Sequence, residues 1–228
     1  MRIDDLNWMD VEAYLKQEDR IMLVLGACEE HGYLSLMTDT RIPLALADAA
    51  SQQTGVLVAP PLNFGVSPYF LTYPGTISLR ASTYLAVVED MVRSLYGQGF
   101  RRFMCLNGHG GNEGVRSRLV ELSNELPGLQ VSWYAWWLSN TVSSLAAKYQ
   151  LKPSHASWME AFSFTRVCEL PPGGKTAPSY TGLLNAERTR QVYGDGVFDG
   201  PYQADEAVMT EMFEAILQDV LYLLKFNT

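Results

Sequence analysis

Short apolar runs alternate along the chain with longer segments in which apolar residues recur every three or four positions. The runs predict buried strands, which we place at residues 21–27, 56–59, 103–106 and 129–134. The periodic segments predict amphipathic helices at residues 9–18, 41–53, 82–96, 115–126, 138–150 and 203–225. Strands that alternate with helices in this way form a mainly parallel sheet, with ligand sites at the carboxyl ends of the strands. The sequence therefore predicts an α/β fold.

Two segments carry neither pattern. Residues 62–79 combine aromatic side chains with turn-forming residues, and loops of this length in a compact domain are commonly functional. Thr76 and Ser78 are its candidate polar contacts to a ligand. The alternative is a surface crossover that is held to the core by its aromatic residues, Phe64, Tyr69, Phe70 and Tyr73. Residues 169–201 are rich in Pro and Gly, and we expect extended surface structure there.

The composition is that of a folded globular protein, with 47% hydrophobic and 18% charged residues. A length of 228 residues suffices for one sizeable α/β core, and we predict a single domain over residues 1–228. The formal net charge is −8. Because nucleic-acid binding depends on clustered Lys and Arg, this charge argues against a nucleic-acid partner.

The sequence indicates which cellular compartment to expect. No run approaches the roughly 20 apolar residues that a transmembrane helix needs, and the start M-R-I-D-D-L is too acidic for a signal peptide. We therefore expect a cytoplasmic protein with no membrane partner. The cysteines, Cys28, Cys105 and Cys168, have no C-x-x-C spacing, so they indicate neither a disulfide framework nor a thiolate zinc site. Cys28 as a nucleophile is a minor alternative.

The stretch from Gly26 to Thr40 follows the first predicted strand and carries the first cluster of acidic and imidazole groups. In an extended chain Glu29 and His31 point to the same side, whereas Glu30 points away. With Asp39 they make half of a site for a borderline metal ion such as zinc. The alternative is a solvated loop after a strand.

The second cluster, N-G-H-G-G-N at residues 107–112, directly follows the third predicted strand. Its glycines either permit a tight strand-to-helix turn or let a ligand approach the backbone, with free N–H groups at the helix start. Neither of the phosphate-binding glycine patterns is present. His109 is therefore the informative residue, and it lies at the same sheet edge as the first cluster if the two strands are neighbours.

The third cluster, H-A-S-W-M-E, runs from His155 to Glu160. Five residues of regular helix turn through about 140° beyond a full circle, so these two side chains cannot both face one metal ion from a helix. We place His155 in the preceding loop, as an acid–base or substrate-binding group. We place Glu160 in the first turns of a helix, as a metal ligand. The chain has only three histidines, and each lies in one of these clusters.

Taken together, the clusters resemble the creatininase (creatinine amidohydrolase) family, over most of the chain from about Ile21 to Glu160. The matching motifs are E-E-H-G at 29–32, T-D at 38–39, Y-P-G-T-I-S-L at 73–79, N-G-H-G-G-N at 107–112 and H-A-S-W-M-E at 155–160. The family patterns to which they are similar read E-Q-H-G, T-D, F-P-G-T-x-S-L, N-G-H-G-G-N and H-A-x-x-x-E. Each motif alone is weak, but five in this order are specific.

The resemblance implies a three-layer α/β/α fold around a mainly parallel sheet, and a hexamer of identical chains. It also implies two divalent metal ions per chain, zinc, manganese or iron. The implied ligands are Asp39 as the bridge, Glu29 and His109 on one ion, and His31 and Glu160 on the other. Such ions make hydroxide available near neutral pH and polarise a scissile carbonyl. His155 would donate a proton to the leaving nitrogen or hydrogen-bond the oxyanion.

Four departures from the family pattern bear on the substrate. Gly111 stands where creatininase itself carries a metal-binding glutamate, which makes Glu160 the natural substitute. The others are Glu30 in place of Gln, Tyr33 in place of Pro-His, and Tyr69 and Phe70 where a histidine is common. These changes leave the metal scaffold intact and weaken the case for creatinine itself as the substrate.

We predict a metal-dependent amidohydrolase that cleaves the C–N bond of a small, non-peptide cyclic amide or formamide, with His155 and Glu160 as catalytic groups. Substrate contacts are predicted from Ser78, Gly110, Gly111 and Trp158. One alternative is a family member without catalysis that acts as a metal- or ligand-binding oligomer. Another is a dinuclear hydrolase of a phosphorylated substrate, for which Arg41 and Arg80 are the only flanking cations.

Overall fold

The centre of the molecule is a parallel sheet of four strands, seen in a computed structural model that describes residues 1–226. The strands, in the order they take across the sheet, are β2 (Leu57–Val58), β1 (Arg20–Leu25), β3 (Arg102–Asn107) and β4 (Gln130–Ala135). All three pairings are parallel. Each strand lies where the apolar runs predict one, so the predicted parallel sheet is confirmed.

Alternate side chains of each strand enter opposite faces of the sheet. In β1, Met22 and Val24 belong to one apolar cluster, whereas Ile21 and Leu23 belong to the other. These side chains are at most 1% exposed, which explains why the strand has no polar side and reads as a continuous apolar run.

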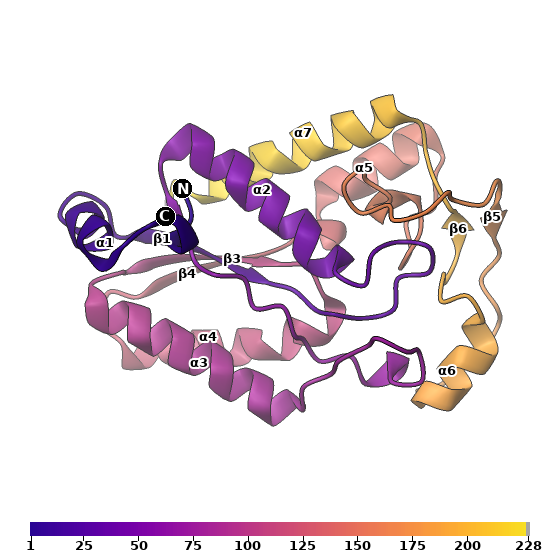
Figure 1. Cartoon of the computed structure of the whole chain (residues 1–228), viewed down its shortest axis with the longest axis horizontal. Helices are drawn as coiled ribbons and strands as arrows, with labels where there is room; N and C mark the ends of the chain where they lie inside the picture. The colour runs from indigo at the N-terminus through magenta and orange to yellow at the C-terminus, as the bar shows by residue number, and fades with distance from the viewer. Residues whose placement is uncertain (227–228) are drawn as a thin grey trace.

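Helices cover both faces of the sheet (Figure 1). One face packs against α2 (Thr38–Thr54), α5 (Asn140–Tyr149) and α7 (Glu206–Leu223). The other packs against α3 (Ala81–Gln98) and α4 (Val115–Glu125). The short helix α1 (Trp8–Leu15) lies where β1 begins, and the Tyr14 hydroxyl donates to the Arg20 carbonyl at 2.7 Å. The predicted three-layer α/β/α fold is therefore confirmed.

Two predictions about the C-terminal part of the chain are wrong. Residues 169–201 contain a helix, α6 (Ala186–Tyr193), and a small hairpin of β5 (Gly174–Lys175) and β6 (Gly200–Pro201). The helix escaped the periodicity criterion because its sequence is largely polar, and only Thr189 and Tyr193 are buried. Glu160 does not begin an α-helix, since it ends a single 3₁₀ turn at Trp158–Glu160.

Further 3₁₀ turns lie at Ile3–Asp5, Pro68–Phe70, Gly110–Gly114 and Trp136–Leu138. Apart from the second of these, residues 62–79 form an irregular loop, as predicted. Within residues 1–226, no helix combines the length and the apolar character that crossing a bilayer requires.

Candidate metal centre

Two neighbouring strands deliver the first and second clusters to one place. The register of the sheet pairs Leu25, the end of β1, with Asn107, the end of β3. The Gly108 N–H donates to the Leu25 carbonyl at 2.9 Å, so the segments remain together beyond the strands. A Cβ at Gly108 would overlap the backbone carbonyl of Asp39, so glycine is required for α2 to approach this closely.

Three buried side chains meet at this edge of the sheet. His109 Nδ1 lies 2.9 Å from Asp39 Oδ2 and 3.2 Å from Glu29 Oε1. Asp39 comes from the first turn of α2, which begins three residues earlier than the apolar pattern predicts. These residues, Glu29, Asp39 and His109, offer ligand atoms that all lie within 4.8 Å of one another, which is close enough to hold one metal ion.

A second set of three side chains shares Asp39 with the first. His31 Nε2 lies 3.0 Å from Asp39 Oδ1 and 3.9 Å from Glu160 Oε2. His31, Asp39 and Glu160 also fall within the 4.8 Å limit, and all three are buried. The two oxygens of Asp39 therefore face different histidines, which is the arrangement of a carboxylate that bridges two ions.

Both histidines are oriented by hydrogen bonds from their outer nitrogens. His109 Nε2 lies 2.9 Å from the Val66 carbonyl oxygen, and His31 Nδ1 lies 3.3 Å from the Glu29 carbonyl oxygen. A nitrogen facing a carbonyl oxygen carries a proton, and this assigns the lone pair of the neutral ring to the inner nitrogen. When both rings are neutral, their two inner lone pairs and the carboxylate oxygens therefore point toward the same place.

The inner contacts are short but do not have hydrogen-bond geometry. Asp39 Oδ2, Glu29 Oε2 and His31 Nε2 are buried and lack a hydrogen-bond partner among the described residues, despite their charged neighbours. Atoms that aim at a common point rather than at each other fit a cation placed between them. The donor set of imidazole nitrogens and carboxylate oxygens suits zinc, manganese or iron.

The carboxylates of the centre perturb both imidazoles. Burial by itself would lower the pKa of His31, but the charges of Asp39 and Glu160 outweigh it and hold the pKa well above its usual range. Burial also opposes protonation of His109, whose pKa is nevertheless held well above its usual value by Glu29 and Asp39. Without a metal ion, each imidazole therefore carries a proton at the position of the ion.

The two acids of the second set respond in opposite directions. Burial would raise the pKa of Asp39, yet the facing histidines lower it below its usual value. The pKa of Glu160 is raised, chiefly by burial, although His31 and His155 oppose this.

The Ala156 N–H donates to Glu160 Oε2 at 2.5 Å, and Ala156 adopts a left-handed backbone with φ of 57°. That bend lets His155 and Glu160 face the same site without an intervening helix.

The match to known proteins covers nearly the whole chain. A family model described as Creatininase: Creatinine amidohydrolase matches residues 4–224. The chain belongs to the creatininase family. This confirms the resemblance drawn from the five motifs, and it makes the chain a member of a family of hydrolases.

Relatives within the creatininase family carry different activities. A creatinine amidohydrolase of Pseudomonas putida is 33% identical over 132 residues, which cover 53% of this chain and 51% of that protein. A mycofactocin precursor peptide peptidase of Mycobacterium ulcerans is 35% identical over 126 residues, or 50% of this chain and 49% of that protein. The chain thus spans about half the length of each of these curated relatives.

The creatininase fold itself extends over the full chain. A solved structure described as Creatininase Mn superposes with a TM-score of 0.77 at 25% sequence identity, and the alignment covers 99% of this chain and 97% of that one. Sequence matches to curated relatives therefore stop at about half the chain, whereas the fold does not.

His155 belongs to neither of these two sets of this creatininase-family chain, although its ring nitrogen lies within 4.8 Å of ligand atoms of Glu29 and His31. Its ring is 4.5 Å from that of His31 and stacks on Phe70 at 4.8 Å and 12°. Nε2 lies 3.5 Å from Glu30 Oε2 and has no hydrogen-bond partner among residues 1–226. Burial and His31 lower the pKa of His155, but Glu30 more than offsets them and the pKa is raised. The predicted loop position of His155 is confirmed.

Two predicted substrate contacts, Trp158 and Ser78, do not line the cavity that opens beside the candidate metal ligands. Trp158 is fully buried in the core, where Nε1 donates to the Lys152 carbonyl at 2.9 Å. Ser78 Oγ accepts from Ser67 N–H at 2.8 Å and donates to the Leu79 carbonyl, so it holds the loop instead. The Thr76 hydroxyl likewise accepts from the backbone N–H of Glu30 at 3.0 Å.

The cavity has a volume of about 560 Å³ and reaches the metal centre at Glu29, Asp39, His109 and Glu160. Gly110 and Gly111 line it, and their contact with a substrate stays a prediction. Its outer part is built by three residues that the sequence analysis did not single out, Tyr180, Tyr193 and Phe198. They come from α6 and its flanking loops, where the sequence offers no motif or periodicity that would bring them to the site.

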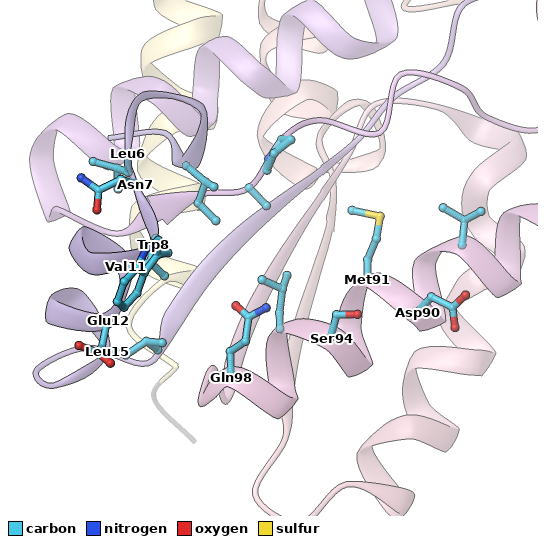
Figure 2. A pocket seen from close by; sticks show the side chains of 15 residues that line it. Leu6, Asn7, Trp8, Val11, Glu12, Leu15, Asp90, Met91, Ser94 and Gln98 are labelled. Carbon is cyan, nitrogen blue, oxygen red and sulfur yellow. The ribbon is translucent and has the colours of Figure 1, made fainter.

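A second hollow, of about 960 Å³, lies between α1 and α3, and none of the candidate metal ligands lines it (Figure 2). Trp8 and Val11 of α1 lie across from Met91 and Ser94 of α3. No histidine or cysteine is among the described residues that line it. It therefore lacks the groups for the chemistry expected of a creatininase-family site.

Proposed function

We propose that this chain is a metal-dependent amidohydrolase that binds two divalent cations and cleaves the C–N bond of a small amide. One observation carries the proposal. The carboxylate of Asp39 lies between two histidines, 3.0 Å from His31 Nε2 and 2.9 Å from His109 Nδ1, and each pair has a further carboxylate beside it. Buried imidazoles and carboxylates that converge in two overlapping sets need positive charge between them, which two cations would supply.

In the proposed site, Glu29, Asp39 and His109 would hold one ion, and His31, Asp39 and Glu160 would hold the other, with Asp39 shared between them. When bound, two such ions lower the pKa of a water molecule and polarise the substrate carbonyl. The chain holds the ligands rigidly, because the Val66 and Glu29 carbonyls fix the histidine rings. The ions are zinc, manganese or iron, in keeping with the imidazole and carboxylate ligands.

His155 is the proposed proton carrier. It lines the cavity next to Glu160, and Nε2 has no hydrogen-bond partner among the described residues. A raised pKa keeps a proton available near neutral pH, where the leaving nitrogen needs one. Glu160 is the second proposed catalytic group, because its carboxylate lies within the second set and its pKa is also raised.

A phosphorylated substrate finds little support. Arg41 is exposed and donates to the Phe164 carbonyl at 3.0 Å, and Arg80 is exposed at the start of α3. Neither arginine lines the cavity. An amide without a phosphate is therefore the better fit, in the form of a cyclic amide or a formamide.

Three further properties of the chain stay predictions. They are the single domain, the cytoplasmic location and the homo-oligomer, which is a hexamer by family resemblance.

The test combines metal analysis with turnover. Protein that is purified without chelators should contain about two divalent ions per chain and should hydrolyse members of a panel of cyclic amides and formamides. His155→Ala should lose turnover and keep its metal. Fewer than about one ion per chain, with no rescue by added zinc, manganese or iron, would contradict the proposal. Bound metal with turnover unchanged in His155→Ala would instead favour a binding protein.

A further inference from the structure

A row of stacked rings leads from the metal centre to the mouth of the cavity. His155 lies 4.8 Å from Phe198, Phe198 stacks on Tyr193 at 3.9 Å and 18°, and Tyr193 meets Tyr180 edge-on at 6.1 Å. We call Phe70, His155, Phe198, Tyr193 and Tyr180 the aromatic wall. All five line the cavity that reaches the two sets of metal ligands.

The aromatic wall is fixed in place by contacts outside the cavity. The Thr72 hydroxyl donates to the Ala186 carbonyl at 2.9 Å, and Arg190 donates to the Thr72 carbonyl at 2.6 Å. These bonds join α6 to the loop that carries Phe70. The Phe198 N–H donates to the His155 carbonyl at 3.2 Å, which connects the two central rings through the backbone. A preformed aromatic surface binds a flat ring with little loss of its own freedom.

Apolar side chains at the mouth are left uncovered. Tyr180 is 44% exposed, Leu138 is 65% exposed and Leu183 is 91% exposed, and all three line the cavity. The volume of about 560 Å³ falls in the range of about 300–1,000 Å³ that is typical of sites for drug-sized ligands. The cavity can therefore take an amide that carries a ring in addition to the bond that is cleaved.

The charges of the cavity disfavour an anionic substituent on the ring. No Lys or Arg is among the described residues that line it. The carboxylates of Glu29, Glu30, Asp39 and Glu160 balance the charge of two divalent cations, so the proton on His155, which the leaving nitrogen takes, is the one positive charge that remains beside them. A carboxylate or phosphate on the substrate would lose its hydration without gaining a partner.

We infer that the aromatic wall is a subsite for an aromatic ring on the leaving amine, so that the substrates are uncharged N-acyl arylalkylamines. The inference rests on the proposed function, because His155 both belongs to the wall and supplies the proton to the leaving nitrogen. Water oxygen forms a bond to the carbonyl carbon, the C–N bond breaks, and the proton goes to nitrogen. The products are a carboxylic acid and an arylalkylamine.

Equilibrium binding tests the subsite without turnover. N-formylbenzylamine, N-formylcyclohexylmethylamine, N-formylmethylamine and the anionic 4-(formylaminomethyl)benzoate are titrated into metal-free protein by calorimetry. The benzyl compound should bind at least about tenfold more tightly than the methyl compound, with the cyclohexyl compound between them. The benzoate should bind more weakly than the benzyl compound. Equal affinities, or tightest binding of the benzoate, would overturn the inference.

Variants at the mouth identify the ring surface. Tyr180→Ala should reduce the benzyl-to-methyl affinity ratio by about three- to tenfold, and Tyr180→Phe should restore it. Tyr222→Ala is the matched control, because Tyr222 is 67% exposed on α7 and does not line the cavity. An unchanged ratio in Tyr180→Ala would contradict the aromatic wall as the subsite.

Turnover by metal-loaded protein separates this inference from the proposed function. Hydrolysis with the same benzyl preference supports both. Hydrolysis of all formamides at similar kcat/KM, without a binding preference, supports the amidohydrolase and overturns the subsite. A binding preference without hydrolysis of any compound supports the ring subsite and contradicts the amidohydrolase.

Discussion

Asp39 Oδ2 lies 2.9 Å from His109 Nδ1, although the two residues are 70 positions apart in the chain. The other oxygen of the same carboxylate lies 3.0 Å from His31 Nε2. Because α2 begins at Thr38, the backbone of its first turn fixes this carboxylate between the ends of β1 and β3. Asp39 is thus the residue on which both sets of candidate ligands depend.

Asp39→Asn should abolish the binding of both ions. The amide keeps the size of the side chain but removes the charge that both sets share, so we expect metal content to fall to well below one ion per chain and kcat/KM to fall by more than about 100-fold. Elemental analysis and turnover check this. Asp90→Asn, at an exposed position on α3, is the control and should change neither. Retention of two ions in Asp39→Asn would exclude the shared bridge.

Metal affinity should rise with pH. The metal-free protein holds protons on His31 and His109, whose pKa values are raised, and each ion must displace the proton of its own histidine. The affinity for each ion should therefore increase by up to about tenfold per pH unit below those raised pKa values, with about two protons released per chain when both ions bind. Calorimetry in buffers of different ionisation enthalpy counts the protons. Release of no protons would contradict the proposed positions of the ions.

The same shifts set the pH dependence of stability without metal. A raised folded-state pKa makes folding favour the protonated form, so this stabilisation is complete below the unfolded value of about 6.5 and is lost as pH rises through the folded values. The lowered pKa of Asp39 acts oppositely, and its contribution is lost in acid. The free energy of unfolding of metal-free protein should therefore fall between about pH 6.5 and alkaline pH, and added metal should reverse the fall. Denaturant titrations measure both.

Glu30→Gln should lower the pKa of His155. Glu30 Oε2 lies 3.5 Å from His155 Nε2, and Glu30 Oε1 accepts the Gly32 N–H, a bond that the amide oxygen of Gln can keep. NMR titration of metal-free protein resolves this, since the chain has only three histidines. A lowered folded pKa removes stabilisation that exists at low pH, so the variant should lose more stability at pH 5.5 than at pH 8. Glu169→Gln, at an exposed position, should change neither quantity.

Adjacent glycines of the N-G-H-G-G-N motif should respond differently to alanine. A Cβ at Gly111 would overlap the Val66 carbonyl oxygen, which belongs to the backbone and cannot rotate away, whereas a Cβ at Gly110 meets nothing within 4 Å. We expect Gly111→Ala to cost about 1–3 kcal/mol of unfolding free energy, and Gly110→Ala to change it by less than about 0.5 kcal/mol. Equal effects would show that the motif needs glycine for another reason.

Core packing gives a prediction that is independent of the metal. Phe103 on β3 is fully buried, so Phe103→Ala should lower the free energy of unfolding by about 3–5 kcal/mol. Val120 on α4 is 64% exposed, and Val120→Ala should change it by less than about 0.5 kcal/mol. Denaturant unfolding of the metal-free variants measures both, and similar losses would contradict the assignment of Val120 to the surface.

The sequence by itself determined the strands of the sheet and the place of three candidate metal ligands at the ends of those strands. Apolar runs mark the strands because both faces of a parallel sheet are buried, and Glu29, His31 and His109 follow two such runs directly. Local patterns suffice for these residues, since the end of a strand fixes where the next few side chains lie. Asp39 and Glu160 were also predicted as ligands from the sequence, but their positions in space were not.

Only the tertiary structure decided the rest. Glu160 reaches His31 because Ala156 takes a left-handed backbone and a single 3₁₀ turn follows, a path that helix periodicity cannot express. Trp158 was expected at the substrate and lies in the core, where it packs in an apolar cluster and its Nε1 donates to the Lys152 carbonyl. The aromatic wall depends on α6 docking against the Phe70 loop through Thr72 and Arg190. Such contacts between distant segments produce no periodic pattern in the sequence. Each side chain packs against partners that become neighbours only when the chain folds.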